Sequence, residues 1–268
     1  MNRNSMTYRW GSWILTGLIF AAACWFLSQW QFARADQVHK NNLLVAKNYD
    51  AVPVPIEALI KPTDSWNPDL EYRVVSVSGN YLPKTTLLVR NRPLDGNPGF
   101  LQLVCFKTDS GNYLWIERGW LASGAKKELP DSIPQVDGKS RKLVLHLRKG
   151  EKDNGLSAPI GQLSNINLLL AGKDLPVTKT YLQAYARLKT ETPELSRGLA
   201  LGKPELSEGN HLSYAFQWII FGLMALGAVG WNISQDRRIR AGQPIRKLKI
   251  LNRDKDAEIE DQILDEKD

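Results

Sequence analysis

The stretch YAFQWIIFGLMALGAVGWNI, residues Tyr214–Ile233, carries the clearest fold information because none of its side chains is charged. An α-helix rises about 1.5 Å per residue, so about twenty apolar residues cross a hydrocarbon layer of about 30 Å. A second uncharged stretch, SWILTGLIFAAACWFLSQW, occupies Ser12–Trp30 near the amino terminus. The sequence therefore predicts two transmembrane helices, over residues 12–33 and 212–233.

The first uncharged stretch also has features of a signal peptide. Arg3 and Arg9 precede it, and the small residues of Ala33–Ala35 are typical of a signal-peptidase site. However, the apolar segment is longer than that of a usual signal, and bulky residues follow it, so we favour a retained helix. A lipoprotein anchored through Cys24 is less favoured, because Ala21 stands where a larger aliphatic residue is normal.

Basic residues predict the orientation of the two helices, because Lys and Arg collect on the cytoplasmic side of a membrane. Arg3 and Arg9 precede the first helix. A basic cluster follows the second helix and contains Arg237, Arg238, Arg240, Arg246, Lys247 and Lys249. We therefore expect residues 1–11 and 234–268 to be cytoplasmic and residues 34–211 to form an extracytoplasmic domain. Too little chain precedes the first helix for an organelle transit peptide, so a bacterial plasma membrane is the expected location.

The net charge of +7 does not indicate a nucleic-acid partner. The tail from Ser234 is neutral overall, with nine basic and nine acidic residues. Arg3 and Arg9 contribute +2, and the remaining +5 is spread along residues 34–211. The basic half of the tail is expected to contact anionic lipid head groups of the bilayer. Its acidic half, Asp254–Asp268, is expected to be solvated and partly disordered.

Between the two helices, apolar and polar residues alternate, which is typical of β-strands. The alternating runs are Glu71–Leu82, Lys84–Leu94, Gly99–Leu121, Arg141–Gly150 and Thr180–Thr190. A hairpin turn is predicted at Asp109–Gly111, short helices at Pro55–Ile60 and Ile160–Gly172, and an outward-facing side chain at His146. The predicted fold is a membrane protein in which two transmembrane α-helices flank a mainly antiparallel β (α+β) extracytoplasmic domain, as a sheet or small barrel.

Motifs of common enzyme classes are absent from the sequence. It has no phosphate-binding glycine loop, no Gly-x-Ser-x-Gly elbow, no zinc-protease helix and no cysteine pair at metal-binding spacing. Cys24 lies in a predicted membrane helix and Cys105 in a predicted strand, so they cannot pair, and Cys105 is expected to be a buried apolar residue. We therefore expect a protein that is not an enzyme.

Polar and aromatic residues gather where the second helix begins. His211, Tyr214, Ala215 and Trp218 share one helical face, because residues three, four and seven apart are neighbours. One interpretation is an aromatic belt at the lipid interface. That interpretation does not account for Gln217, since an amide in a membrane helix needs a polar partner. The outer end of the first helix offers Gln29, Trp30, Gln31 and Arg34 as matching polar groups.

A glycine inside an alternating run indicates a local irregularity. Gly119 lies between Arg118 and Trp120, which predicts a bulge or tight bend where only a small residue fits. Two roles are open for this motif: a structural one, which we favour, and a surface that contacts a partner.

Three segments together resemble the surfeit-locus family of cytochrome c oxidase assembly factors. They are WQFAR at Trp30–Arg34, IERGWL at Ile116–Leu121 and NHLSYAFQW at Asn210–Trp218, in the order and spacing of that family. The resemblance covers nearly the whole chain up to Ile233, and it includes the motif residues Trp30, Gln31, Arg118, Gly119, Trp120 and Gln217.

The resemblance implies an assembly factor that transiently binds heme a and assists its insertion into the core subunit of the oxidase. It implies His211 as the ligand of the heme iron. Imidazole is a common axial ligand of heme, and Tyr214 and Trp218 would flank the porphyrin. Arg34 is a candidate partner of the heme propionates, although it could instead reach the lipid head groups. Expected partners are the oxidase core subunit and other assembly factors of the respiratory chain.

Two other classes of function remain open. The protein could be a scaffold or chaperone that stabilises the nascent core subunit without binding heme. It could also be an envelope sensor, but its tail lacks the hydrophobic periodicity of an output domain. The scaffold is therefore the main alternative.

Overall fold

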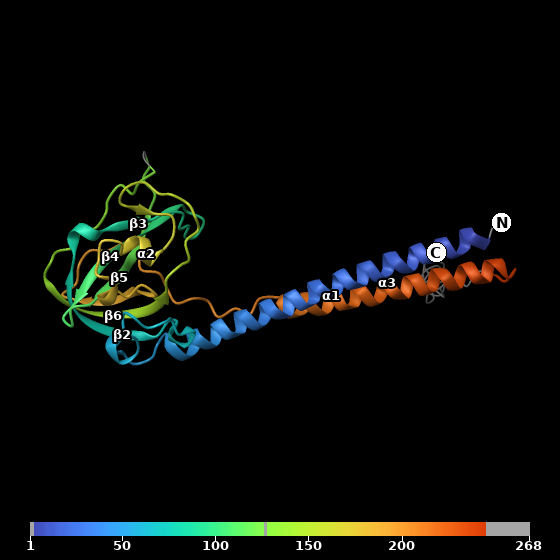
Figure 1. Cartoon of the computed structure of the whole chain (residues 1–268), viewed down its shortest axis with the longest axis horizontal. Helices are drawn as coiled ribbons and strands as arrows, with labels where there is room; N and C mark the ends of the chain where they lie inside the picture. The colour runs from blue at the N-terminus through green and yellow to red at the C-terminus, as the bar shows by residue number, and fades with distance from the viewer. Residues whose placement is uncertain (1–2, 126–127, 245–268) are drawn as a thin grey trace, which may run out of the picture. The chain divides into compact units, whose positions relative to one another are not determined.

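The computed structural model describes residues 3–125 and 128–244. The chain divides into two compact units, of which one combines the chain up to Asp36 with the chain from Gly209 onward. The other unit is Gln37–Glu208 and contains all the strands (Figure 1). The predicted lipid-binding residues Arg246, Lys247 and Lys249 and the acidic segment Asp254–Asp268 lie outside the described residues.

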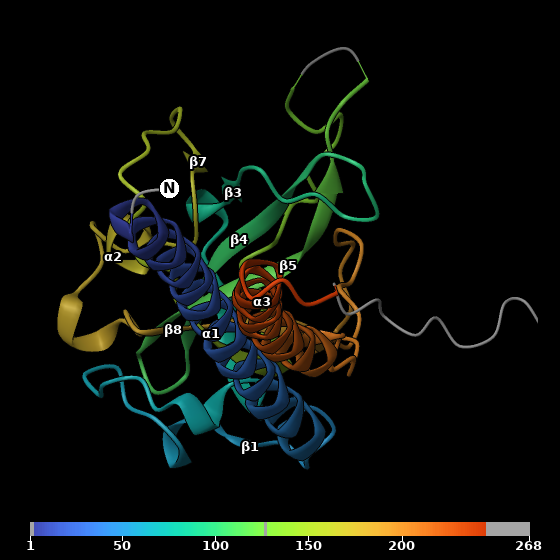
Figure 2. The same cartoon turned by 90° about the vertical axis from the view of Figure 1, so that its right-hand side faces the viewer.

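Two long helices account for most of the first unit. Helix α1 spans Arg3–Asn48 and helix α3 spans His211–Arg240. Both are long and apolar enough to cross a membrane, in agreement with the two uncharged stretches. Up to Asp36, α1 runs beside α3 (Figures 1 and 2). Helix α1 does not end with the apolar stretch near Ala33, and its last turns belong to the β-rich unit.

Small residues line the contact between α1 and α3. Cys24 and Ser28 on α1 and Ala215 on α3 are fully buried, although the faces around them are exposed. Gly222 of α3 lies against Cys24, and a Cβ atom added there would come within 3.4 Å of the Cys24 Cβ. Small side chains allow two helix backbones to approach closely, which is the usual way that membrane helices associate.

A polar cluster joins the two helices at the end that contains the amino terminus. The indole Nε1 of Trp10 donates to Asp236 Oδ2 at 2.7 Å, and the Arg9 guanidinium also pairs with Asp236. The Arg237 guanidinium lies 5.0 Å from the centre of the Trp10 ring. Asp236 also pairs with Arg240 Nε at 3.0 Å, so it neutralises part of the basic cluster that follows the second apolar stretch.

The β-rich unit confirms the prediction of a mainly antiparallel β domain. Its strands are β1 Val54–Pro55, β2 Val74–Tyr81, β3 Leu87–Val89, β4 Gly99–Thr108, β5 Tyr113–Ala122, β6 Ser140–Lys149, β7 Gln162–Leu163 and β8 Ala184–Thr192. Its helical segments are α2, Leu168–Ala171, and four 3-10 turns at Ile56–Ala58, Pro68–Leu70, Pro83–Thr85 and Val177–Lys179. The predicted hairpin turn at Asp109–Gly111 joins β4 to β5, with Gly111 at a positive φ of 81°.

Five strands close into a small barrel. Strand β2 pairs with both β6 and β4, so the order β2-β6-β8-β5-β4 returns to β2. A ring with an odd number of strands cannot alternate in direction throughout, and β5 and β8 form the parallel pair. A closed five-stranded barrel of this connectivity is the architecture of the OB-fold, although a fold alone does not establish a function.

The barrel wall formed by β4 and β5 is buried on both faces. One core fills the interior and includes Val104, Phe106 and Ile116, while a second core covers the outer face at Leu103, Cys105 and Trp115. Strands β3 and β7 and helix α2 contribute Val89, Leu163 and Leu168 to this outer core. Cys105 is fully buried, as expected, and burial raises the pKa of its thiol to about 12.

His146 lies on the outer face of its strand, opposite Leu145 and Leu147 of the interior core, but it is covered there and does not face solvent. His146 is 3% exposed, its Nε2 donates to the Tyr49 carbonyl oxygen at 2.9 Å, and its ring stacks on the Tyr49 ring. Burial lowers the pKa of His146 from its usual value, although the Tyr49 carbonyl opposes this shift. Strand alternation shows which residues share a face, but the chain that covers this face is almost a hundred residues away.

Two predicted helices are largely replaced by other structure. Of Pro55–Ile60, Ile56–Ala58 alone forms a 3-10 turn, and Pro55 belongs to strand β1. Of Ile160–Gly172, the first part contains strand β7 and Leu168–Ala171 alone is helical. The run Lys84–Leu94 also contributes a strand of Leu87–Val89 alone. In each case the conformation of the segment depends on where it packs in the folded domain more than on the periodicity of its own sequence.

Candidate functional site

His211 is the first residue of α3, and it contacts α1 through its side chain. Its Nδ1 lies 3.0 Å from the Oε1 atom of Gln31. An amide oxygen accepts hydrogen bonds and does not donate them, so a neutral imidazole that makes this contact carries its proton on Nδ1 and keeps the lone pair of Nε2. Histidines that bind metals are commonly oriented in this way by an acceptor on the other ring nitrogen.

Aromatic side chains lie around His211, but they do not all face the same way. Trp30 and Tyr214 are 61% and 49% exposed, whereas Ala215 is fully buried toward α1. Trp218 is half-buried, and its ring meets the Phe221 ring edge to face with 5.9 Å between centres. The residues predicted to share one helical face therefore do not have one environment. Ala215 makes a buried contact, whereas Tyr214 belongs to an exposed aromatic surface.

Gln217 and Arg34 are both exposed on this end of the helix pair. The side chain of Gln217 makes no hydrogen bond to the outer end of α1 or to any other described residue. Of the polar residues at the outer end of α1, Gln31 hydrogen-bonds to His211. An exposed amide within an apolar helix is a suitable contact point for a polar group of another membrane protein.

The donor set around His211 is compatible with heme but not with a metal ion held by protein side chains alone. The described residues contain no group of three or more His, Cys, Asp or Glu side chains that could hold a metal ion. Heme iron needs few protein ligands because the porphyrin occupies its equatorial positions, and an imidazole is a common axial ligand. A single imidazole with an oriented Nε2 beside exposed aromatic rings meets this requirement.

Arg118 lies inside the barrel and not on its surface. Its Nη2 donates to Glu191 Oε1 at 2.8 Å, and the hydroxyl of Tyr81 donates to Glu191 Oε2 at 3.1 Å. Both Arg118 and Glu191 are almost fully buried, and the guanidinium lies 5.0 Å from the centre of the Tyr81 ring. Removing one member of such a buried pair leaves the other charge without compensation, so this cluster supports the fold.

Gly119 occupies the predicted irregularity, which is a β-bulge. Gln102 pairs with Gly119, but the next residue of β4, Leu103, pairs with Glu117, so Arg118 is the extra residue. Gly119 has a φ of 127°, and a Cβ atom there would lie 2.6 Å from the Gly198 carbonyl oxygen. The bulge thus requires glycine both for its backbone conformation and for the close approach of the Gly198 backbone.

Trp120 is held in place by backbone groups on both sides. Its indole Nε1 donates to the Arg92 carbonyl oxygen at 2.5 Å, and its backbone exchanges two hydrogen bonds with Leu199. Gly99 leaves the space that the indole ring fills. These contacts favour the structural role of this motif over a partner surface.

Several residues of these clusters were not predicted from the sequence as site residues. Arg187 shares its single Nε–H between the two carboxylate oxygens of Glu117 and donates from Nη2 as well, and Glu117 is fully buried. Glu191 is the common partner of Arg118 and Tyr81. The signal in the sequence is the presence of charged residues inside the apolar runs of alternating strands, because such residues need partners when buried.

The sequence of this chain is similar to those of known proteins. The SURF1 family matches residues 18–223, a range that includes Gln31, Arg118–Trp120 and His211. SURF1-like proteins of Mycobacterium tuberculosis and Mycobacterium bovis are each 30% identical over 247 residues, covering 87% of this chain and 89% of theirs. Cytochrome oxidase assembly protein SHY1 of Saccharomyces cerevisiae is 30% identical over 129 residues, covering 46% of this chain and 31% of the yeast protein.

Proposed function

The chain belongs to the SURF1 family, and from this membership we propose that it is a membrane-bound assembly factor of cytochrome oxidase that binds heme a. The link to oxidase assembly is supported by the relationship to the yeast assembly protein. The observation that carries the heme proposal is the contact between His211 Nδ1 and Gln31, which orients Nε2 as an available ligand. In this proposal the protein holds and transfers a group without transforming it, so it is not an enzyme.

We propose that α1 and α3 cross a bacterial plasma membrane. Arg9 and Gln31, which take part in the polar contacts at the two ends of the helix pair, are separated by about 33 Å along α1 at 1.5 Å per residue. This length matches the hydrocarbon thickness of a bilayer. Basic residues at the Asp236 end favour a cytoplasmic location of both termini, so His211 and the β-rich unit lie outside the cytoplasm.

A reporter fusion tests this orientation. Alkaline phosphatase fused after Lys152 is expected to be active, because the enzyme folds outside the cytoplasm, whereas a fusion after Gly242 is expected to be inactive. Matched cytoplasmic reporters at the same two positions should give the opposite activities. Equal phosphatase activity at both positions would contradict the two-span topology.

In this proposal, each residue around His211 contacts a different part of heme a. His211 would bind the iron through Nε2, and Gln31 would keep the ring in the required tautomer and orientation. Tyr214 and Trp218 would contact the porphyrin, and Arg34 would pair with a propionate. The bound heme would supply the redox-active iron that the oxidase core subunit needs.

The exposed amide of Gln217 favours direct contact with a partner protein in the membrane. We propose the oxidase core subunit as this partner, with other assembly factors in the same complex. If the protein stabilises this subunit without holding heme, it acts as a scaffold, which is the alternative function.

Purification of the full chain from cells that make heme a distinguishes these two functions. We expect an absorption band of heme a at about one heme per protein, together with copurification of the core subunit. Purification from a strain that lacks heme a synthesis provides the matched control for the band. A colourless protein that still copurifies with the core subunit would exclude the heme carrier and support the scaffold.

A further inference from the structure

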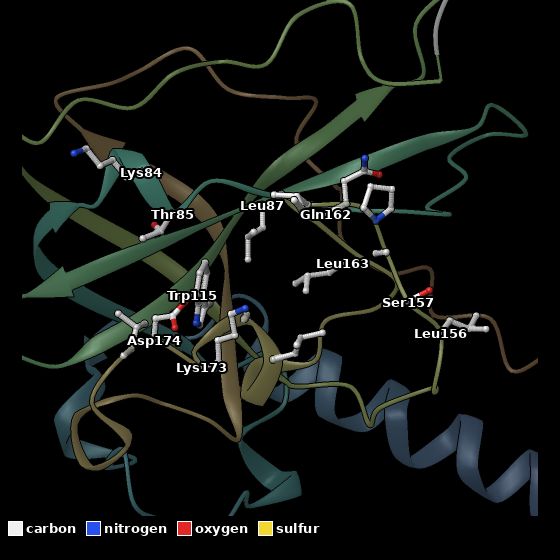
Figure 3. A pocket seen from close by; sticks show the side chains of 17 residues that line it. Lys84, Thr85, Leu87, Trp115, Leu156, Ser157, Gln162, Leu163, Lys173 and Asp174 are labelled. Carbon is white, nitrogen blue, oxygen red and sulfur yellow. The ribbon is translucent and has the colours of Figure 1, made fainter.

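A pocket of about 440 Å³ opens on the outer face of the barrel, within the β-rich unit. Trp115 of β5 forms one wall, and residues 156–163 and 170–175 form the others (Figure 3). Pockets of this size hold small organic molecules in many proteins. The proposed heme function uses none of these residues.

Trp115 provides an unpartnered donor in the wall of this pocket. The side chain is 2% exposed, and its indole Nε1 has no hydrogen-bond partner among the described residues. The nitrogen points to the end of the pocket where Lys173 and Asp174 lie (Figure 3). A buried donor without an acceptor is costly, so a ligand that supplies an acceptor oxygen gains free energy at this position.

The charged residues of the lining carry a positive excess. Lys84 and Lys173 line the pocket, and within the described residues neither has an ion-pair partner. Asp174 is the acidic residue among those that line it. Two cations and one anion around an indole N–H favour an anionic acceptor over a cation.

The remaining lining is apolar and partly open to solvent. Leu87, Leu163 and Leu175 contribute side chains to the wall. Ile160 is fully exposed, and Leu156 is 63% exposed, although both line the pocket. A ligand with an apolar body would cover these side chains and remove them from water.

We propose that this pocket binds a small amphipathic carboxylate. Its carboxylate would accept from Trp115 Nε1 and pair with Lys173, while its apolar body would lie against Leu87 and Leu163. Asp174 would oppose the negative charge and so limit the affinity.

Titration with 4-phenylbutyrate at pH 7 tests this site on the full-length protein in lipid nanodiscs. The indole N–H resonances of the nine tryptophans are followed after ¹⁵N labelling, and Trp115→Phe identifies the resonance of Trp115. We expect saturable movement of this one resonance with a dissociation constant on the order of 1 mM, as the size of the probe suggests. Absence of a saturable change at Trp115 up to ten times that concentration would overturn the proposal.

Matched probes and variants identify the contribution of charge. The amide 4-phenylbutanamide, which has the same apolar body, is expected to bind about tenfold more weakly, because it loses the charge-assisted contacts. Lys173→Gln should weaken binding of the carboxylate, whereas Asp174→Asn should strengthen it. Both residues are exposed, so neither substitution should unfold the domain. Equal affinities for the acid and the amide, or a reversed order of the two variants, would contradict a carboxylate site.

Discussion

His211→Ala is expected to abolish the heme that copurifies with the protein while the helices and the barrel remain folded. The substitution removes the imidazole whose Nε2 would bind iron, and it deletes the hydrogen bond to Gln31. Losing that bond costs about 1 kcal/mol, which is small against the stability of a folded domain. The measurement is the ratio of heme to protein in the purified variant, at equal abundance in the membrane.

Three variants serve as comparisons for His211→Ala. Gln31→Ala removes the residue that orients the imidazole, and such changes typically weaken metal binding by about 10- to 100-fold. Tyr214→Phe keeps the exposed ring and should retain heme. His39→Ala removes a histidine of α1 that pairs with Glu208, and it should also retain heme. An unchanged heme ratio in His211→Ala would exclude this residue as an essential ligand and favour the scaffold.

Gly119→Ala is expected to destabilise the barrel by about 3 kcal/mol or more, from backbone strain and steric overlap together. The added Cβ atom would lie 2.6 Å from the Gly198 carbonyl oxygen at a φ of 127°. The Gly198 backbone cannot move away easily, because Leu199 exchanges two hydrogen bonds with Trp120. The measurement is the thermal or denaturant midpoint of the purified full chain, together with its abundance in the membrane.

Gly111→Ala is the matched control, because Gly111 also has a positive φ but has no atom within 4 Å of an added Cβ. It should cost about 1 kcal/mol from backbone strain alone. If both variants lower stability equally, the close approach at Gly198 does not contribute. If Gly119→Ala is as stable as the wild type but oxidase assembly is lost, the motif is a partner surface.

Local patterns in the sequence were sufficient to predict most of the long elements of this protein. The lack of charge over Tyr214–Ile233 predicts a long apolar helix, since twenty consecutive residues are enough to establish that property. Alternation predicted strands β4 to β6 and β8, and Gly111 and Gly119 marked a turn and a bulge. Each of these inferences depends on neighbours within a few residues.

The ambiguous runs show where local patterns stop being informative. The apolar residues Leu168–Leu170 suggested a helix that extends back to Ile160. In the structure, however, Gln162 and Leu163 of that range form strand β7, which pairs with β3. Similarly, the alternation around His146 was correct, but the covering ring of Tyr49 comes from the end of α1. Periodicity describes one element, whereas burial depends on which other element packs on it.

The sequence by itself therefore determined two apolar helices, a mainly antiparallel β domain and the glycine at the bulge, because these follow from length, charge and alternation along the chain. Only the tertiary structure decided that the strands close through the β2–β4 and β5–β8 pairs. It also buried Arg118 beside Glu191 and brought His211 to Gln31, which are 180 residues apart in the chain. Such contacts depend on the register in which distant segments pack, and no local pattern of residues encodes that register.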